Sequence, residues 1–378
     1  MSDNRLATAF GEFELLPLHW HPRSPLRAWS AADELLLQRV TEQPPADSAR
    51  ILLVNDSSGA LGVALQQWQP CSWNDSISSR FALEQNLARN QFSTDRVCFV
   101  PATTSPDGPF DLVLLQLPKT LSLLEYQLVH LRAQLHPHTR IIAGGMVKHM
   151  ASSMIELFSR ILGPTHTSLA QKKARLIFAQ FDPALAPVLP PSPRYGLPGT
   201  PLQLVNHANV FSQQKLDIGT RFLLEHFPDL SAAQSILDLG CGNGALGIFA
   251  GWRHPNVTLH FVDDSALALQ SARDSFALNG LGNTAQFYQD DGLEHFDGSV
   301  DAILCNPPFH EGNRVHTDIA ARMFRGAARA LNGGGSLTIV ANRHLDYRAL
   351  LQPHFRQIRL LQGNSKFVIL LASGPTPR

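Results

Sequence analysis

The chain has 378 residues, of which 44% are hydrophobic and 16% charged, enough for two or three domains with buried cores. Its 31 basic and 31 acidic side chains cancel, and a net charge of zero taken alone argues against a nucleic-acid partner. Because no run of eighteen apolar residues and no charged-then-apolar amino terminus occurs, we expect neither a membrane-spanning helix nor a secretory signal.

Charge and cysteine are unevenly distributed along the chain. Between His310 and Arg378 there are ten Lys or Arg residues against three Asp or Glu, whereas Asp290–Asp301 holds five acids and no Lys or Arg. Four cysteines are spaced too widely for a zinc site or a disulfide framework: Cys71, Cys98, Cys241 and Cys305. This spacing suits a reducing compartment, so we expect a cytoplasmic protein without a metal.

The first half contains a partial copy of the second. A helical pattern near Ala31–Val40 precedes the stretch Ile51–Gly62, which opens on an apolar strand. Six of its twelve residues are identical in Ile236–Gly247, 185 residues later, and Asp111–Pro118 corresponds to Asp301–Pro308 at a slightly larger offset. A repeat of nearly half the chain predicts two similar domains, since solenoid repeats have much shorter periods.

A proline-rich segment separates the two halves. Seven prolines fall between Pro183 and Pro201, a composition that favours an extended, semi-rigid linker. We therefore predict a first domain over residues 1–185, a linker over 186–200 and a second domain over 201–378.

Short apolar runs alternate with helical patterns in the second half, which predicts a mostly parallel α/β sheet with helices on both faces. Only Gly363-Asn364 separates the last two runs, so the sheet should end in an antiparallel hairpin. Helices are expected at 265–279 and 318–331. The predicted strands are Ser235–Leu239, Thr258–Val262, Ala285–Tyr288, Val300–Cys305, Ser336–Ala341, Arg356–Leu361 and Phe367–Ala372.

A glycine-rich loop follows the first strand of this half. Its glycines, Gly240, Gly242 and Gly244, allow a sharp turn and a close ligand approach. Three acids end successive strands and should meet at one edge of the sheet. Asp238 suits a ligand ammonium group, Asp263 a ribose diol, and Asp290 an adenine amino group. Helix capping and turn formation are the alternative roles of these residues.

The strand Val300–Cys305 runs into Asn306-Pro307-Pro308-Phe309. A polar amide, two rigid prolines and an aromatic ring at a strand end suit a flat, nitrogen-bearing ligand. Cys305 precedes the amide inside the apolar run, so we expect it to pack rather than react.

Together these motifs resemble class I S-adenosylmethionine-dependent methyltransferases, a family with a Rossmann-like fold. The Asn-Pro-Pro-Phe motif is similar to that of enzymes that methylate amino groups of nucleobases. His310 after this motif, and a degenerate first half, resemble the bacterial rRNA guanine-N2 methyltransferases. Stretches such as His207–Ser212, Leu216–Gly219 and Val340–Tyr347 are most similar to the large-subunit branch of that family.

The resemblance implies a substrate, a cofactor and residue roles. We expect methylation of a guanine 2-amino group in 23S rRNA by a monomer that uses S-adenosylmethionine and no metal. Asn306 and Pro307 would accept hydrogen bonds from the amino group, with Phe309 stacking on the base. The cofactor would contact Asp238, Gly240, Gly242, Gly244, Asp263, Asp290 and Asn306. Further candidates for substrate contact are Pro308, His310, Arg322, Arg325 and Arg343.

Several alternatives remain open from the sequence. The substrate could be 16S rRNA, adenine in DNA or a protein glutamine, and a non-catalytic RNA-binding protein is the alternative from another class. His310 could instead cap a turn. The arginines at 322, 325 and 329 recur at helical spacing, which is also typical of a solvated helix face. Phe211, Lys215 and Asp217 match the family in a segment expected near the cofactor.

The first copy has lost the site residues. Leu53, Asn55, Ser57 and Asn74 replace Asp238, Gly240, Gly242 and Asp263, and Gln116-Leu117-Pro118-Lys119 replaces the Asn-Pro-Pro-Phe motif. We therefore predict no cofactor there and a role in positioning RNA. Candidate phosphate contacts are Lys119, Lys148, Lys172, Lys173 and Arg175.

Overall fold

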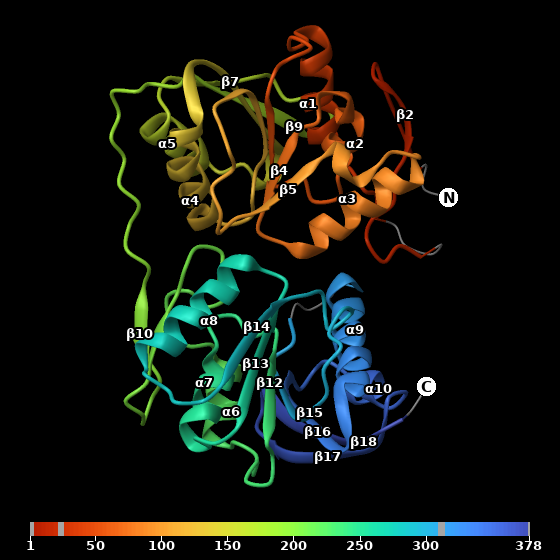
Figure 1. Ribbon diagram of the computed structural model, residues 1–378, viewed down its shortest axis with the longest axis vertical. Helices are drawn as coiled ribbons and strands as arrows, with labels where there is room; N and C mark the ends of the chain where they lie inside the picture. The colour runs from red at the N-terminus through yellow and green to blue at the C-terminus, as the bar shows by residue number, and fades with distance from the viewer. Residues whose placement is uncertain (1–3, 22–25, 309–313, 377–378) are drawn as a thin grey trace. The chain divides into compact units, whose positions relative to one another are not determined.

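The computed structural model describes residues 4–21, 26–308 and 314–376, and the chain divides into two compact units, Met1–Pro191 and Ser192–Arg378 (Figure 1). Within the described ranges, no helix combines the length and the apolar character that crossing a membrane requires.

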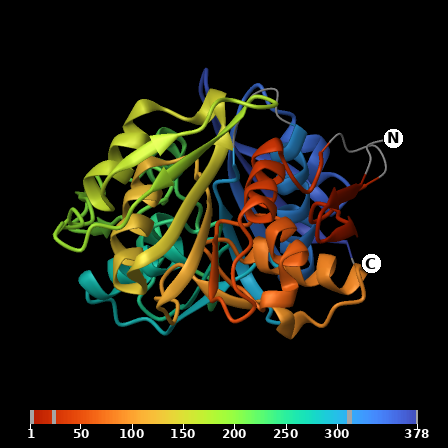
Figure 2. The same cartoon turned by 90° about the horizontal axis from the view of Figure 1, so that it is seen from above.

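The first unit contains a seven-stranded sheet in the order β5-β4-β3-β6-β7-β9-β8. This unit is drawn from red to yellow-green in Figure 2. Neighbouring strands are parallel from β5 to β7, and β9 pairs antiparallel with both β7 and β8. Its elements are β1 (Arg5–Thr8), β2 (Gly11–Glu14), α1 (Ala31–Glu42), β3 (Ile51–Val54), α2 (Ala60–Ala64), β4 (Cys71–Asn74), α3 (Ile77–Arg89), β5 (Cys98–Pro101), β6 (Phe110–Gln116), α4 (Leu121–Leu131), β7 (Leu135–Met146), α5 (Ser152–Ile161), β8 (Thr165–Thr167) and β9 (Ala174–Ala179).

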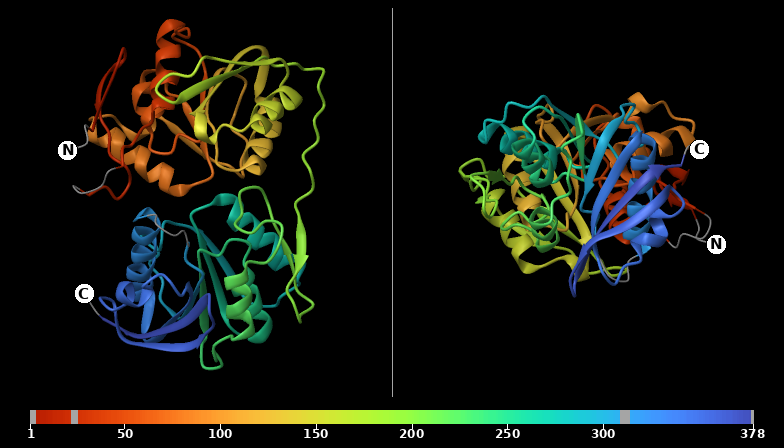
Figure 3. Two further views of the ribbon diagram at one scale, coloured as in Figure 1. Left: turned by 180° about the vertical axis from the view of Figure 1, so that it is seen from behind. Right: turned by 90° about the horizontal axis from the view of Figure 1, so that it is seen from below.

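The second unit repeats this topology, with seven strands in the order β14-β13-β12-β15-β16-β18-β17. This unit is drawn from green to blue in Figure 3. Its elements are β10 (Arg194–Gly196), β11 (Gln203–Val205), α6 (Ile218–Glu225), β12 (Ser235–Leu239), α7 (Ala245–Arg253), β13 (Thr258–Asp263), α8 (Ala266–Leu278), β14 (Ala285–Gln289), β15 (Val300–Cys305), α9 (Arg314–Ala330), β16 (Leu331–Asn342), α10 (Tyr347–Leu351), β17 (Phe355–Gly363) and β18 (Phe367–Pro375). The strand order confirms the predicted fold: two Rossmann-like domains, each with a mostly parallel sheet that ends in antiparallel strands.

Apolar side chains on both faces of the second sheet explain its layers. Successive residues of β12 alternate, so Ile236 belongs to the core under α7 and α8, whereas Leu237 belongs to the core under α9 and α10. Figure 1 shows these two helix pairs on opposite sides of the sheet.

The predicted linker is partly folded in the structure. The second unit begins at Ser192, and β10, inside the predicted linker, pairs antiparallel with β11. Leu197 is buried in the core of this unit. Proline content marks the absence of a long helix, but it does not reveal which apolar side chains will pack.

Candidate active site

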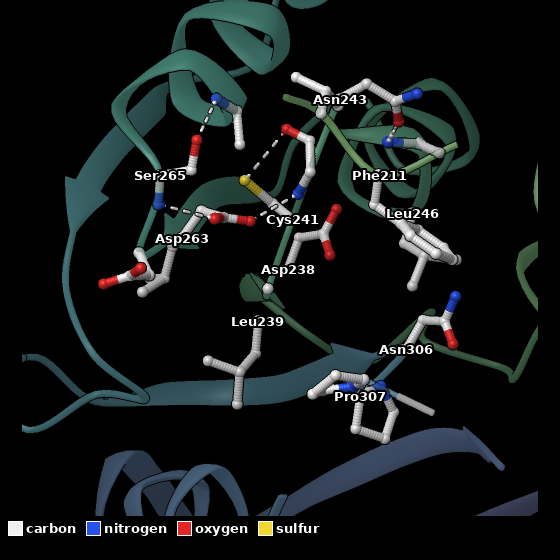
Figure 4. Close-up of a pocket in the computed structure, with 18 of the residues that line it drawn as sticks. Phe211, Asp238, Leu239, Cys241, Asn243, Leu246, Asp263, Ser265, Asn306 and Pro307 are labelled. Carbon is white, nitrogen blue, oxygen red and sulfur yellow. Dashed lines mark hydrogen bonds between the residues drawn. The ribbon is translucent and has the colours of Figure 1, made fainter. Parts of the chain in front are cut away.

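A pocket of about 340 Å³ lies over the carboxyl ends of the parallel strands of the second unit (Figure 4). The predicted site residues that line it are Asp238, Gly240, Gly242, Asp263, Asp290, Asn306, Pro307 and Pro308. Phe309 and His310 lie outside the described residues. The structure thus brings together side chains from the ends of β12, β13, β14 and β15, as a parallel sheet requires.

Two of the three loop glycines meet the pocket. Gly240 and Gly242 have φ angles of 69° and 54°, a left-handed conformation that favours glycine. A Cβ at Gly242 would meet no atom within 4 Å, so the backbone is open to a ligand at this point.

The cofactor-contact prediction for Gly244 is not supported by the geometry. This residue precedes α7 with φ 83°, and it is not among the residues that line the pocket. A Cβ here would lie 3.1 Å from Cβ of Ala272 and from Cδ1 of Ile248. Gly244 therefore serves the close packing of α7 on α8, a role that its spacing in the motif does not distinguish from ligand contact.

Asp238 is a buried acid beneath the glycine loop, with a side chain that is 1% exposed. Its Oδ2 accepts a hydrogen bond of 2.8 Å from the amide of Gly247 in the first turn of α7. Burial, with a smaller contribution from the nearby Asp263 carboxylate, raises the pKa of Asp238 to about 8. A cationic ligand group would stabilise the ionised form of this side chain.

Asp263, the last residue of β13, holds the glycine loop in place through a hydrogen bond. Its Oδ2 accepts a hydrogen bond of 2.9 Å from the amide of Gly242, and its Oδ1 accepts one of 2.9 Å from the amide of Ser265 (Figure 4). A carboxylate oxygen can accept more than one hydrogen bond, so both oxygens can still bind a ligand hydroxyl. The orientation of the carboxylate is fixed before a ligand arrives.

Asp290 shows the turn-forming role that was left open. Its two carboxylate oxygens accept hydrogen bonds of 2.8 Å from the amide of Asp291 and 2.9 Å from the amide of His295. The residue is 4% exposed and lines the pocket. Contact with an adenine amino group remains a proposal for Asp290.

Asn306 follows the last residue of β15, and two hydrogen bonds hold the NH₂ group of its side-chain amide. Its Nδ2 donates hydrogen bonds of 3.1 Å to Oδ2 of Asp217 and 2.8 Å to Oγ1 of Thr220. Its Oδ1 is buried and has no hydrogen-bond partner among the described residues. A buried acceptor without a partner destabilises a protein by ~1–3 kcal/mol. A ligand that donates a hydrogen bond to this oxygen would remove that cost.

Tyr347 holds the turn formed by Pro307 and Pro308 after Asn306. The hydroxyl of Tyr347 donates a hydrogen bond of 3.1 Å to the carbonyl oxygen of Pro308. Burial raises the pKa of Tyr347 to about 12, which keeps this donor protonated at neutral pH. The turn after β15 is thereby fixed at both Asn306 and Pro308.

Further pocket residues came from outside the predicted motifs. The hydroxyl of Tyr195 accepts a hydrogen bond of 2.7 Å from Asn243 and donates one of 3.1 Å to the carbonyl of Ser212. These bonds tie the glycine loop to β10. Phe211, expected only from the resemblance, lines the pocket with its side chain 62% exposed. No local sequence signal marks Tyr195, because its partner lies 48 residues away.

The arginine stripe of α9 pairs with the acidic segment that follows β14. Arg322 forms an ion pair of 3.2 Å with Asp291, and Arg325 forms one of 2.7 Å with Glu294. The side chain of Arg322 is only 17% exposed, so it is neither a solvated face nor an open phosphate contact. Arg343 is exposed and donates a hydrogen bond of 2.6 Å to the carbonyl of Asn364. None of the three lines the pocket.

The first unit keeps the backbone of the glycine loop but fills the space beside it. Asn55, the counterpart of Gly240, retains a left-handed φ of 62°. Its side-chain amide exchanges hydrogen bonds of 2.7 and 2.9 Å with Gln127 and donates one of 3.0 Å to the carbonyl of Gln116. These bonds join the residue after β3 to the end of β6 and to α4, at the position that corresponds to Gly240.

A buried acid also takes the place of Asp238 in the first unit. Oδ2 of Asp56 accepts a hydrogen bond of 2.8 Å from the amide of Gly62, whose counterpart Gly247 donates to Asp238. The helix start is thus held in both units, although the acid comes from a different position of the loop.

Comparison with known proteins identifies both halves. Residues 3–183 match the family model described as RLMG N-terminal domain, and residues 201–371 match the model described as Methyltransferase small domain. The Thermus thermophilus 16S rRNA N2 G1207 methyltransferase RsmC, solved with AdoMet and guanosine, covers 98% of this chain and 97% of its own. Its TM-score of 0.76 at 22% identity shows that the two proteins share a fold.

Curated relatives match along nearly the whole chain. Ribosomal RNA large subunit methyltransferase G of Ectopseudomonas mendocina is 46% identical over 97% of this chain and 98% of its own length. The protein of the same name from Streptomyces griseus is 45% identical over 98% and 99%. The resemblance to the large-subunit branch is confirmed: the chain belongs to the ribosomal RNA large subunit methyltransferase G family.

Proposed function

We propose that the chain transfers a methyl group from S-adenosylmethionine to the 2-amino group of one guanine in 23S rRNA, and that the second unit alone carries the reaction. The observation that carries this proposal is Oδ1 of Asn306, which is buried and has no hydrogen-bond partner within the part of the chain that the structure describes. It lies beside a pocket built from a glycine loop and strand-end acids. Such an acceptor suits a substrate N–H. Family membership favours large-subunit rRNA over the 16S alternative.

The residues present fit S-adenosylmethionine. Asp238, whose pKa is raised by burial, would hold the ammonium group of the methionine part. Asp263, with its carboxylate oriented by Gly242 and Ser265, would accept from the ribose hydroxyls. The open backbone at Gly242 leaves room for close approach. Asp290 would accept a hydrogen bond from the adenine amino group.

The guanine amino group is a weak nucleophile because its lone pair is delocalised into the ring. Oδ1 of Asn306 and the carbonyl of Pro307 would each accept one amino hydrogen, which favours a pyramidal nitrogen with its lone pair turned out of the ring plane. When bound, S-adenosylmethionine would supply a sulfonium methyl; its transfer to the amino nitrogen would leave S-adenosylhomocysteine and release one proton from the methylated amine to water. The acceptors are fixed in advance by Asp217, Thr220 and Tyr347, which lowers the reorganisation needed for reaction.

We also propose that the first unit positions the RNA. Lys119, Lys148 and Lys173 are exposed and available to phosphates. Lys172, also exposed, forms an ion pair of 2.6 Å with Glu34, which reduces the positive charge it offers. Arg175 is half-buried, so we assign it a lesser part.

Analysis of rRNA from cells that lack this protein tests the proposed function. Mass spectrometry of nuclease fragments should show one N2-methylguanine missing from 23S rRNA, and a plasmid copy of the wild-type chain should restore it. Loss from 16S rRNA would move the chain to the small-subunit activity. Unchanged methylation of both rRNAs would overturn the proposal.

Cofactor stoichiometry tests the assignment to one unit. Calorimetric titration of the full-length chain with S-adenosylhomocysteine should give one site per chain, because Asn55 and Gln127 fill the corresponding space in the first unit. The Asp238→Asn variant should lose most of the heat of this site, while Asp56→Asn should keep it. Two sites per chain, or a site that survives in Asp238→Asn and disappears in Asp56→Asn, would contradict the assignment.

A further inference from the structure

We infer that Asp217 and Thr220, at the amino-terminal end of α6, are positioning residues: they orient the Asn306 amide so that its oxygen faces the substrate, and the Asp217 carboxylate strengthens that oxygen as an acceptor. The inference rests on the proposed function, since it concerns the same amino-group acceptor. It adds a second layer behind the Asn-Pro-Pro-Phe motif, built from a helix more than eighty residues earlier in the chain.

The chemistry of the partners decides which way the amide points. An ionised carboxylate can only accept hydrogen bonds, so the group of Asn306 that lies 3.1 Å from Oδ2 of Asp217 must be the NH₂. Turning the amide over would place its oxygen against a carboxylate oxygen. The oxygen is therefore directed away from Asp217 and Thr220, where it is buried and has no partner among the described residues.

The carboxylate is itself fixed by the helix. Asp217 is the N-cap of α6, and its Oδ2 also accepts a hydrogen bond of 2.9 Å from the amide of Thr220. One oxygen atom thus joins the first turn of α6 to the end of β15. Thr220 is buried and Asn306 is half-buried, so bulk water competes little for these bonds.

A glycine allows α6 to approach closely enough for this contact. A Cβ at Gly219 would lie 3.0 Å from Oδ2 of Asp217 and 3.3 Å from Cε1 of Phe367 on β18. Both distances are tighter than ordinary van der Waals contact. The motif Leu216–Gly219 therefore has a physical explanation: Asp217 caps the helix and holds Asn306, and Gly219 leaves the space for both.

The charge of Asp217 acts in the direction that the reaction needs. Positive charge develops on the guanine amino nitrogen as the new N–C bond forms. A carboxylate behind the Asn306 amide polarises it, which increases the negative charge on Oδ1 where it accepts the substrate hydrogen. An uncharged side chain at position 217 could keep the hydrogen bond but would lose this polarisation.

The degenerate unit holds the same contact without the reaction. There Gln116, the counterpart of Asn306, donates from Nε2 to Oδ1 of Asp33 in the first turn of α1. Helix α1 precedes β3 as α6 precedes β12. The contact between helix start and strand end therefore belongs to the architecture of both copies. Asp33 supplies a matched control for any purely structural effect of breaking it.

The test compares Asp217→Asn, Thr220→Val and Thr220→Ser with Asp33→Asn in the full-length chain. Methyl transfer to 23S rRNA lacking the modification gives kcat and KM, calorimetry with S-adenosylhomocysteine gives cofactor affinity, and thermal melting reports folding. We expect kcat to fall about 10–100-fold in Asp217→Asn and about 3–10-fold in Thr220→Val, with KM and cofactor affinity nearly constant. Thr220→Ser should restore most of kcat, and Asp33→Asn should leave it unchanged.

The outcomes separate this inference from the proposed function. A wild-type chain that leaves 23S rRNA unmethylated would count against the proposed function itself. An active wild type with equally active Asp217→Asn and Thr220→Val variants would overturn the positioning role alone. So would a loss of kcat that follows a loss of cofactor affinity, or an equal loss in Asp33→Asn.

Discussion

Replacing Asn306 with alanine should lower kcat for methyl transfer by about 10²–10³-fold, the loss typical when one preorganised polar partner of a transition state is removed. The variant loses the Oδ1 acceptor, and it also loses the Nδ2 donor of the hydrogen bonds to Asp217 and Thr220. Single-turnover assays with labelled cofactor and unmodified 23S rRNA measure the effect on the chemical step. In our proposal Asp238 and Asp263 make the charged contacts to the cofactor, so cofactor affinity should change far less.

The Gln116→Ala variant is the control for this substitution. Gln116 ends the equivalent strand of the first unit and bonds to Asp33 in the same manner, but it adjoins no intact glycine loop. It should methylate at the wild-type rate. Wild-type activity in a folded Asn306→Ala variant would show that the amide is not the acceptor.

Asp238 should make cofactor binding depend on pH. In the free protein burial raises its pKa to about 8, above the unfolded value, so the side chain adds stability at low pH that is lost as the pH rises towards 8. Pairing with an ammonium group requires the carboxylate, so binding below pH 8 releases a proton. We therefore expect affinity for S-adenosylhomocysteine to rise about 20-fold between pH 6 and pH 7.5, in proportion to the ionised fraction of Asp238.

Asp238→Asn should remove this dependence and weaken binding at pH 7.5 by about 10²-fold or more, because a buried cation loses its charged partner. Calorimetry in buffers of different ionisation enthalpy measures both the affinity and the proton release. Asp56→Asn is the matched control, since burial raises the pKa of Asp56 to about 7 in a unit without a cofactor site. A pH profile that stays unchanged in Asp238→Asn would exclude Asp238 as the titrating group.

Local patterns predicted most of the fold. The strands Ser235–Leu239 and Val300–Cys305 were predicted with the bounds that the structure has, because each is a short apolar run between turn residues. β16 begins at Leu331 instead of Ser336, since Leu331 pairs with Val300 across a register shift. Three glycines follow this pairing, and glycine normally signals the absence of a strand. α9 begins at Arg314, four residues before the predicted start.

The site was predictable where one residue type meets one chemical need, as at Asp238, Asp263 and Asn306. It was not predictable where the partner lies elsewhere in the chain. Nothing near Asn306 in the sequence points to Thr220, and nothing near Arg322 shows that Asp291 neutralises it. Gly244 illustrates a third case, in which a motif position has two physical explanations and only the packing of α7 on α8 decides between them.

The hydrogen bonds between the side-chain amides of Asn55 and Gln127 in the first unit have a consequence for the synthesis and maintenance of the chain. A domain that binds a ligand gains about 2.7 kcal/mol of stability when the ligand is at a hundred times its Kd, and loses this gain when the ligand is depleted. We propose that the second unit alone binds S-adenosylmethionine; on that proposal the first unit, in which Asn55 and Gln127 exchange hydrogen bonds, gains no stability from the methyl donor. This half leaves the ribosome first, and the stability of the half made later would follow the cellular supply of methyl donor.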